Sequence, residues 1–141
     1  MLSRSVALIL LVTGFCLGIQ AAQVTEKTFR ESVRLLDEET KKLDVLKCST
    51  QLADLLKVDR VVVETNLLQK KITFSTLATA KLVADKVALP VQAVLDDKSK
   101  PDWTETLQNV GISLIVAQEH LDNLYSELVL LRMDQKTKRK K

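Results

Sequence analysis

The most regular spacing of apolar residues lies in the C-terminal third of the chain, where they follow one another in alternating steps of four and three. The positions of this repeat are Trp103, Leu107, Val110, Leu114, Ala117, Leu121, Leu124, Leu128 and Leu131. Such a heptad pattern is typical of a helix that buries one face. It predicts one continuous helix of about 30 residues, which would be about 45 Å long. Asp102 and Glu105 are expected to cap its start, and Gly111 inside it would cost about 1 kcal/mol relative to alanine.

A second helix is predicted in the middle of the chain, with apolar residues in the same spacing. Its repeat comprises Leu77, Ala80, Ala84, Val87, Val91 and Val94. Further apolar residues extend the pattern back toward Val61, and Asp59 is a suitable N-cap. Because a proline ring clashes with the preceding helical turn, Pro90 is expected to kink this helix or to end it near Ala88. Residues 91–97 would then form a last short turn or two.

The N-terminal third is predicted to be helical, with a change of phase in the middle. Thr28 and Glu31 have the spacing of a capping box, in which each side chain satisfies a free amide at a helix start. The first apolar repeat is Phe29, Val33, Leu36 and Leu43, and the second is Val45, Cys48, Leu52 and Leu55. A bend or short break is therefore expected at residues 46–50, with Ser49 or Thr50 as the cap of the next piece.

Together these patterns predict an all-α protein. Three long helices with short connections would pack as an elongated antiparallel bundle, and four or five shorter helices with breaks near Cys48 and Pro90 are the alternative. The chain of 141 residues is long enough for one domain, and it contains only 3 glycines and 2 prolines. An all-β fold needs turn residues about every 8–12 positions, so this composition argues against it. The sequence also has no Gly-rich loop that would bind phosphate.

The first 22 residues have the layout of a secretory signal peptide. Arg4 provides the charged start, residues 6–12 are apolar, and small residues allow cleavage after Ala22 or Ala21, with Gly18 as a third option. A membrane anchor is the alternative, but the apolar stretch of about 14 residues is shorter than the roughly 20 that span a bilayer. We therefore expect a signal peptide at 1–22, a helical bundle domain at 23–135, and a basic C-terminal tail at 136–141. The mature protein is expected to be secreted and extracellular.

The tail carries five basic residues among the last six. They are Lys136, Lys138, Arg139, Lys140 and Lys141. Such a tail is suited to bind an anionic polysaccharide, an anionic lipid surface or an acidic protein. A frayed, solubilising end of the last helix is the alternative. Nucleic acid is not an expected partner, because the leader directs the protein out of the cell.

The sequence offers few residues for catalysis or metal binding. Cys48 would be the one cysteine left after removal of the leader, and its place in an apolar repeat favours a buried thiol in a monomer over a disulfide-linked dimer. His120 has no second metal ligand three or four residues away, so it is expected to be a solvated helix residue. The acidic run 37–39 is expected to form a solvated face, and the lysine pairs 41–42 and 70–71 are expected on helix surfaces. No catalytic residue, metal or cofactor is predicted, and the chain is not expected to be an enzyme.

In its general build the chain is similar to the small salivary proteins of blood-feeding anopheline mosquitoes, the anophensin and albicin type. The likeness lies in the leader that ends Gln20-Ala21-Ala22, the helical body from Thr28 to Leu131 and the basic end at 136–141. The resemblance implies a secreted, all-helical protein that blocks host complement or contact-phase activation by binding.

Two functions are expected on these grounds. The first is a non-enzymatic binding protein that contacts an extracellular protein partner, with inhibition of a complement or coagulation cascade as one form of it. Apolar residues that lie off the repeats, such as Val61, Ile115 and Leu130, favour this function if they face outward, although wider helix packing would also absorb them. The alternative is an extracellular carrier whose amphipathic helices hold lipid or another hydrophobic ligand.

Overall fold

The computed structural model describes residues 25–97 and 102–139, which form helices and connecting turns without any strand. The helices are an N-terminal helix at 25–41, α2 at Val45–Leu56, α3 at Arg60–Val63, the π-helix η1 at Glu64–Gln69, α4 at Phe74–Val87, α5 at Val91–Asp96, α6 at Trp103–Asn109 and α7 at Leu114–Arg139. The predicted all-α class is confirmed. The predicted signal peptide at 1–22 lies outside the described residues, as do Lys140 and Lys141.

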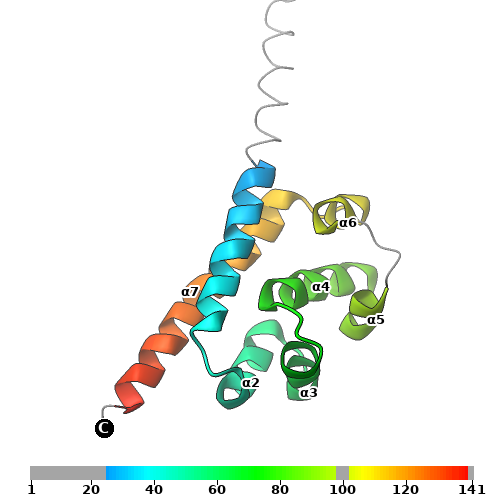
Figure 1. The fold of residues 1–141 in the computed structure, drawn as a ribbon. Helices are drawn as coiled ribbons and strands as arrows, with labels where there is room; N and C mark the ends of the chain where they lie inside the picture. Colours follow the sequence, from blue (N-terminus) through cyan, green and yellow to red (C-terminus); the bar gives the residue numbers. More distant parts are fainter. Residues whose placement is uncertain (1–24, 98–101, 140–141) are drawn as a thin grey trace, which may run out of the picture.

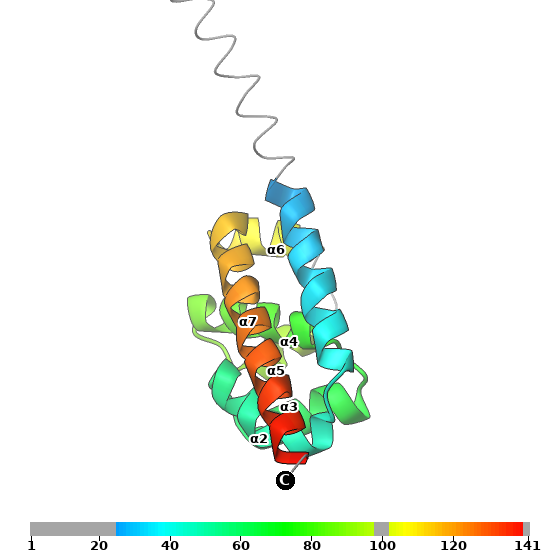
Figure 2. The same ribbon diagram turned by 90° about the vertical axis from the view of Figure 1, so that its left-hand side faces the viewer.

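The N-terminal helix and α7 are the two long helices, and they run side by side in the same direction (Figure 1, Figure 2). Thr28 Oγ1 donates a hydrogen bond to Gln118 Oε1 at 2.7 Å, and Ser32 Oγ donates one to Asp122 Oδ1 at 2.6 Å. The residue numbers rise together along both helices, as a parallel pair requires. The shorter helices α2 to α5 pack against one face of this pair, and α6 leads into α7 (Figure 1).

This arrangement differs from the predicted bundle of three long helices. The chain between the two long helices is divided into the short helices α2 to α6. Breaks near Cys48 and Pro90 alone do not account for this division, so the alternative of four or five helices also differs from the structure. The physical reason is that helix ends are set here by N-caps and by residues in left-handed conformation, which a repeat of apolar residues does not reveal.

One face of the N-terminal helix is buried against the rest of the protein. Phe29 and Leu36 lie on this face, as their spacing predicts, and the polar Ser32 and Glu39 share it. The prediction of a solvated face at 37–39 is therefore wrong for Glu39. Thr28 lies inside the helix, where its Oγ1 is 3.0 Å from the backbone oxygen of residue 25, so the predicted capping box is also wrong.

The first break in the chain lies at residues 42–44, earlier than the predicted interval 46–50. Asp44 is the N-cap of α2, because its carboxylate accepts a hydrogen bond from the amide of Lys47 at 3.3 Å. Ser49 lies inside α2 and donates its hydroxyl to the backbone oxygen of Leu46 at 3.1 Å. The change of apolar phase between Leu43 and Val45 thus coincides with the break.

The predicted second helix is interrupted at residues 70–73. Lys71 has a positive φ of 57°, and Thr73 caps α4 by accepting a hydrogen bond from the amide of Thr76 at 3.3 Å. The predicted effect of Pro90 is confirmed, since α4 ends at Val87 with Ala88 as its C-cap, and α5 begins directly after the proline.

The predicted helix from Trp103 to Leu131 is broken at Gly111, whose φ is 81°. The amide of Gly111 donates to the oxygen of Gln108 at 3.1 Å, and the amide of Ile112 donates to the oxygen of Leu107 at 2.8 Å. This pair of hydrogen bonds is a Schellman motif, which satisfies the last carbonyl groups of α6. The glycine that was expected inside the helix is therefore the residue that ends it.

The predicted apolar seam is nevertheless buried on both sides of this break. Its buried members are Leu107, Leu114, Ala117, Leu121, Leu124 and Leu128, and its half-buried members are Trp103, Val110 and Leu131. Ser113 restarts the helix, because its Oγ accepts a hydrogen bond from the amide of Val116 at 3.2 Å. The seam survives because a short Schellman turn lets α7 present the same face to the core as α6 does.

Candidate functional site

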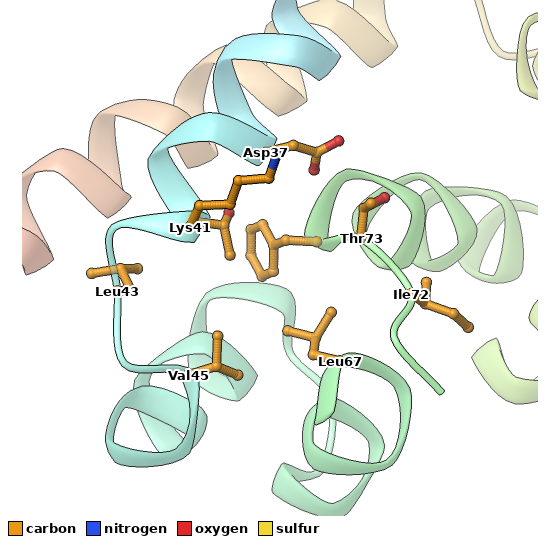
Figure 3. Close-up of a pocket in the computed structure, with 9 residues that line it drawn as sticks. Asp37, Lys41, Leu43, Val45, Leu67, Ile72 and Thr73 are labelled. Carbon is orange, nitrogen blue, oxygen red and sulfur yellow. The ribbon is translucent and has the colours of Figure 1, made fainter. Parts of the chain in front are cut away.

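A cleft with a volume of about 300 Å³ opens where four elements meet (Figure 3). It is lined by Asp37, Thr40, Lys41, Leu43, Val45, Leu67, Ile72, Thr73 and Phe74. The end of the N-terminal helix forms one wall, and the starts of α2 and α4 together with η1 form the rest (Figure 3). This volume lies at the lower end of the roughly 300–1,000 Å³ that is usual for ligand pockets.

Asp37 joins the N-terminal helix to the start of α4. Its carboxylate accepts hydrogen bonds from the backbone amide of Ser75 at 3.0 Å and from the Ser75 hydroxyl at 2.7 Å. Ser75 lies in the first turn of α4, where the helix dipole stabilises a negative charge. Thr40, one turn further on, donates its hydroxyl to the backbone oxygen of Leu36 at 2.8 Å. Asp37 therefore holds two helices together, whereas Thr40 is bonded within its own helix.

The opposite wall depends on the π-helix η1. Asn66 is buried there, and its Nδ2 donates hydrogen bonds to the backbone oxygen of Val62 at 2.8 Å and to Gln92 Oε1 of α5 at 2.9 Å. The amide of Ile72 donates to the backbone oxygen of Asn66 at 2.8 Å, which folds the chain back at the end of η1. This wider turn places Leu67 in the wall of the cleft (Figure 3). Turns of this kind are frequent at functional sites.

The cleft combines an apolar wall with a single cation that is free to bind. Thr73 Oγ1 accepts from the amide of Thr76 and donates to its hydroxyl at 2.8 Å, so its polar atom is engaged. Lys41 is exposed, and its ammonium group makes no hydrogen bond or ion pair within the described part of the chain. Chemically, this arrangement suits an apolar body beside an anionic group.

The first residues of the predicted tail lie on a helix. Lys136 and Lys138 lie near the end of α7, and Arg139 is its last residue. Lys136 lines a second hollow of about 200 Å³. The other residues of that hollow are Lys42, Asp44, Arg132 and Gln135. The structure thus brings one tail lysine beside cations of the helical body.

A buried carboxylate holds two of these cations. Glu39 is only 2% exposed, and it accepts hydrogen bonds from Arg132 Nε and from Lys42 Nζ, the latter at 3.1 Å. Burial of the carboxylate acts to raise the pKa of Glu39, but the hydrogen bonds from Arg132 and Lys42 outweigh it, so the pKa lies below its ordinary value of 4.5. This network connects the end of the N-terminal helix to the last turns of α7.

Cys48 lies within α2 and faces the core. Its side chain is fully buried, and its Sγ accepts a hydrogen bond from Gln135 Nε2 of α7. The predicted burial of this thiol is confirmed. The monomeric state stays a prediction.

His120 is half-buried on α7, so the prediction of a solvated side chain is wrong. Its Nε2 is buried and has no hydrogen-bond partner among the described residues. Removal from water lowers the pKa of His120, and the negative charge of Asp85 on α4 acts in the opposite direction. His120 is not one of the seam positions on α7, so the apolar repeat gave no sign of this burial.

The two lysine pairs lie at different kinds of position. Lys41 ends the N-terminal helix, and Lys42 begins the turn after it. Lys70 and Lys71 lie in the connection between η1 and α4, so the prediction of a helix surface is wrong for this pair. Lys70 forms an ion pair with Asp96 at 3.2 Å.

The apolar residues off the predicted repeats divide into two groups. Val63 and Ile112 are buried, whereas Val61, Ile115 and Leu130 are exposed. A shallow groove of about 500 Å³ lies between α4 and the start of α7. It is lined by Leu82, Asp85, Lys86, Gly111, Ile112, Ser113 and Val116.

The patterns in the sequence do not indicate the cleft, because its lining comes from four separate segments. Two signals point to it in retrospect. Asp37 is an acidic residue beside the buried face of the N-terminal helix, and Thr73 is a capping residue directly before Phe74.

Comparison with known proteins gives no relative, since the chain matches no protein-family profile, no curated protein and no solved structure. The resemblance to the mosquito salivary proteins therefore stays a prediction. Within residues 25–97 and 102–139, no helix combines the length and the apolar character needed to cross a bilayer. The same residues contain no group of three or more His, Cys, Asp or Glu side chains placed to bind a metal ion.

Proposed function

We propose that the protein is a non-enzymatic, extracellular binding protein that holds a small apolar ligand in the cleft between the N-terminal helix, α2, η1 and α4. The supporting observation is the cleft itself, with a volume of about 300 Å³ and a mainly apolar wall. Its apolar side chains are Leu43, Val45, Leu67, Ile72 and Phe74. A ligand that covers this wall gains about 25 cal/mol for each Å² of apolar surface removed from water.

This proposal corresponds to the carrier that the amphipathic helices predict, with one difference in mechanism. The cleft already exists between packed helices, so a small ligand can enter without the helices separating. Ligand sites between helices are usually formed in advance in this way. The leader pattern at residues 1–22 supports the extracellular location.

The test is an amide NMR titration of the purified protein with 1-decanol as the probe. We expect chemical-shift changes at residues 41–45 and 67–74 that saturate. Val45→Trp should weaken binding at least tenfold, because the larger ring fills the cleft at the start of α2. Leu46→Trp is the matched control, since Leu46 is 59% exposed and does not line the cleft. Shifts centred on Leu82 and Val116, or equal binding by both variants, would contradict the proposal.

A second candidate function is the binding of an extracellular protein, which includes the inhibition of a host cascade implied by the salivary resemblance. Ile115 is 58% exposed and Val116 is 52% exposed, and Val116 lines the shallow groove beside α4. Exposed apolar side chains next to a groove are typical of protein-binding surfaces. In a pull-down from extracellular fluid, Val116→Glu should abolish capture of a partner. Capture that persists in this variant would exclude the groove as the binding surface.

A further inference from the structure

We propose that the ligand of the cleft is an amphiphile with an acidic head group, whose anion is bound by the ammonium group of Lys41. This inference rests on the proposed function, because it names the class of ligand for the same cleft. The supporting observation is that one polar side chain of the cleft wall, Lys41, has no partner among the described residues, whereas the others are hydrogen-bonded within the protein.

Four residues of the cleft wall carry polar side chains, and three of them are bound within the protein. Asp37 accepts two hydrogen bonds from Ser75, and Thr40 donates to the backbone oxygen of Leu36. Thr73 is engaged as the N-cap of α4. Lys41 remains, and no described residue binds its ammonium group. A polar group of the ligand therefore meets a donor with a positive charge, which selects an anion.

The carboxylate of Asp37 lies in the same wall, and its negative charge would repel an anionic ligand. Both of its oxygen atoms accept hydrogen bonds from Ser75, and the N-terminus of the 14-residue helix α4 stabilises its charge. Asp37 forms no ion pair with Lys41 within 4.0 Å, although several such pairs occur elsewhere in the described residues. The positive charge of Lys41 is thus available to the ligand, while the negative charge of Asp37 is bound by the start of α4.

The size of the cleft limits the apolar part of the ligand. About 300 Å³ is small for a binding pocket, so a single chain of medium length or one ring system fits, and a lipid with two long chains does not. Because Lys41 is exposed, the acidic group would remain partly in water at the rim. This is the common position for the charged end of an amphiphile.

The experiment compares decanoate with 1-decanol at neutral pH, by calorimetry and amide NMR on the purified protein. Both probes have the same chain length, and only the acid is charged. We expect decanoate to bind roughly fivefold more tightly, a modest gain because a partly exposed charge pair is screened by water. Added salt should reduce this preference. In Lys41→Met the two probes should bind equally.

Lys42→Met is the matched control. Lys42 is the next residue in the chain, but it lines the other hollow and pairs with Glu39. The preference for decanoate should persist in this variant. Equal binding of both probes to the unmodified protein overturns the acidic head group and leaves the proposed function standing. A preference that survives Lys41→Met overturns the role of Lys41. Binding of neither probe contradicts the proposed function itself, and the inference with it.

Discussion

At the scale of single residues, Glu39 shows how a buried charge is stabilised by its partners. It is the one acidic side chain on the buried face of the N-terminal helix, and Arg132 and Lys42 together satisfy its oxygen atoms. A buried carboxylate is tolerated only when such partners replace the water that it loses. The same three residues tie the end of the first helix to the end of the last one.

Glu39→Gln should lower the free energy of unfolding by about 2 kcal/mol at neutral pH, because it leaves Arg132 without its counter-charge. The loss should be smaller than for a fully buried pair, since the side chain of Arg132 is 24% exposed. Urea unfolding followed by circular dichroism measures this change. Glu38→Gln is the control: Glu38 is exposed, so the midpoint should remain almost unchanged. Equal losses in both variants would show that Glu39 is not the critical carboxylate.

The stability of the unmodified protein relative to Glu39→Gln should depend on pH. The pKa of Glu39 is lower in the folded protein than its ordinary value of 4.5, so its contribution to stability is present above that value and is lost as the pH falls through the folded pKa. The difference in stability between the unmodified protein and Glu39→Gln should therefore shrink as the pH falls below 4.5. A difference that stays constant down to strongly acidic pH would contradict the lowered pKa.

His120 gives a second prediction at this scale. Removal from water lowers its pKa below 6.5, so protonation favours the unfolded chain and stability falls as the pH drops below that value. An NMR titration of the ring protons should give a midpoint below 6.5. Asp85→Asn should lower this midpoint further, because Asp85 stabilises the protonated ring. A midpoint at 6.5 or above in both proteins would place His120 in water.

At the scale of helices, the ends of several elements are set by residues with positive φ. Lys57, Lys71 and Ala88 adopt this conformation although they carry a Cβ atom, and Gly111 adopts it at the end of α6. The left-handed conformation costs about 1–2 kcal/mol for a residue with a side chain. These positions therefore show where tertiary packing has overcome local preference.

Gly111→Ala tests the break between α6 and α7, because a continuous helix and the observed turn predict stability changes of opposite sign. In a continuous helix the substitution would stabilise the protein by about 1 kcal/mol. In the observed turn it should destabilise by about 1 kcal/mol, since alanine disfavours the positive φ. Steric clash does not interfere, because an added Cβ would approach no atom closer than Lys86 Cε at 4.0 Å. Thermal unfolding distinguishes the two signs.

Ala88→Gly is the converse substitution at the end of α4. Glycine adopts the φ of 58° without strain, although it also gives the unfolded chain more freedom. We expect a net stabilisation of about 0.5 kcal/mol. A loss of stability, as glycine causes in the middle of an exposed helix, would show that α4 continues through residue 88.

At the scale of the whole molecule, the tail is expected to be separable from the fold. Lys136 and Lys138 are exposed at the end of α7, so deletion of residues 136–141 should change the melting temperature little. Affinity for heparin should fall sharply, and in the intact protein it should weaken steeply with added salt. Elution from a heparin column measures both effects. Heparin binding that survives the deletion would move the site to Lys42 and Arg132, which line the hollow beside Lys136.

The buried positions of the last two helices could be predicted from the sequence, because burial there follows the spacing of Leu107, Leu121 and the other seam residues. The end of α4 before Pro90 could be predicted too, but the other helix breaks could not. They depend on caps such as Asp44 and Ser113, which belong to residue types that are common in helices and loops alike, and on Lys71, whose positive φ has no local signal. The cleft could not be predicted either, because its walls come together only after all four elements have packed.

The parallel pairing of the two long helices has a consequence for the speed of folding. Thr28 and Gln118 are 90 positions apart in the chain, and so are Ser32 and Asp122. The pair cannot form by a simple hairpin, since two parallel helices need a connection that returns along their full length. Helices α2 to α6 supply that return path, so the interface between the two long helices closes late and folding should be slow for a helical protein of this size. During synthesis on the ribosome, the N-terminal helix would wait for its partner until almost the entire chain had emerged.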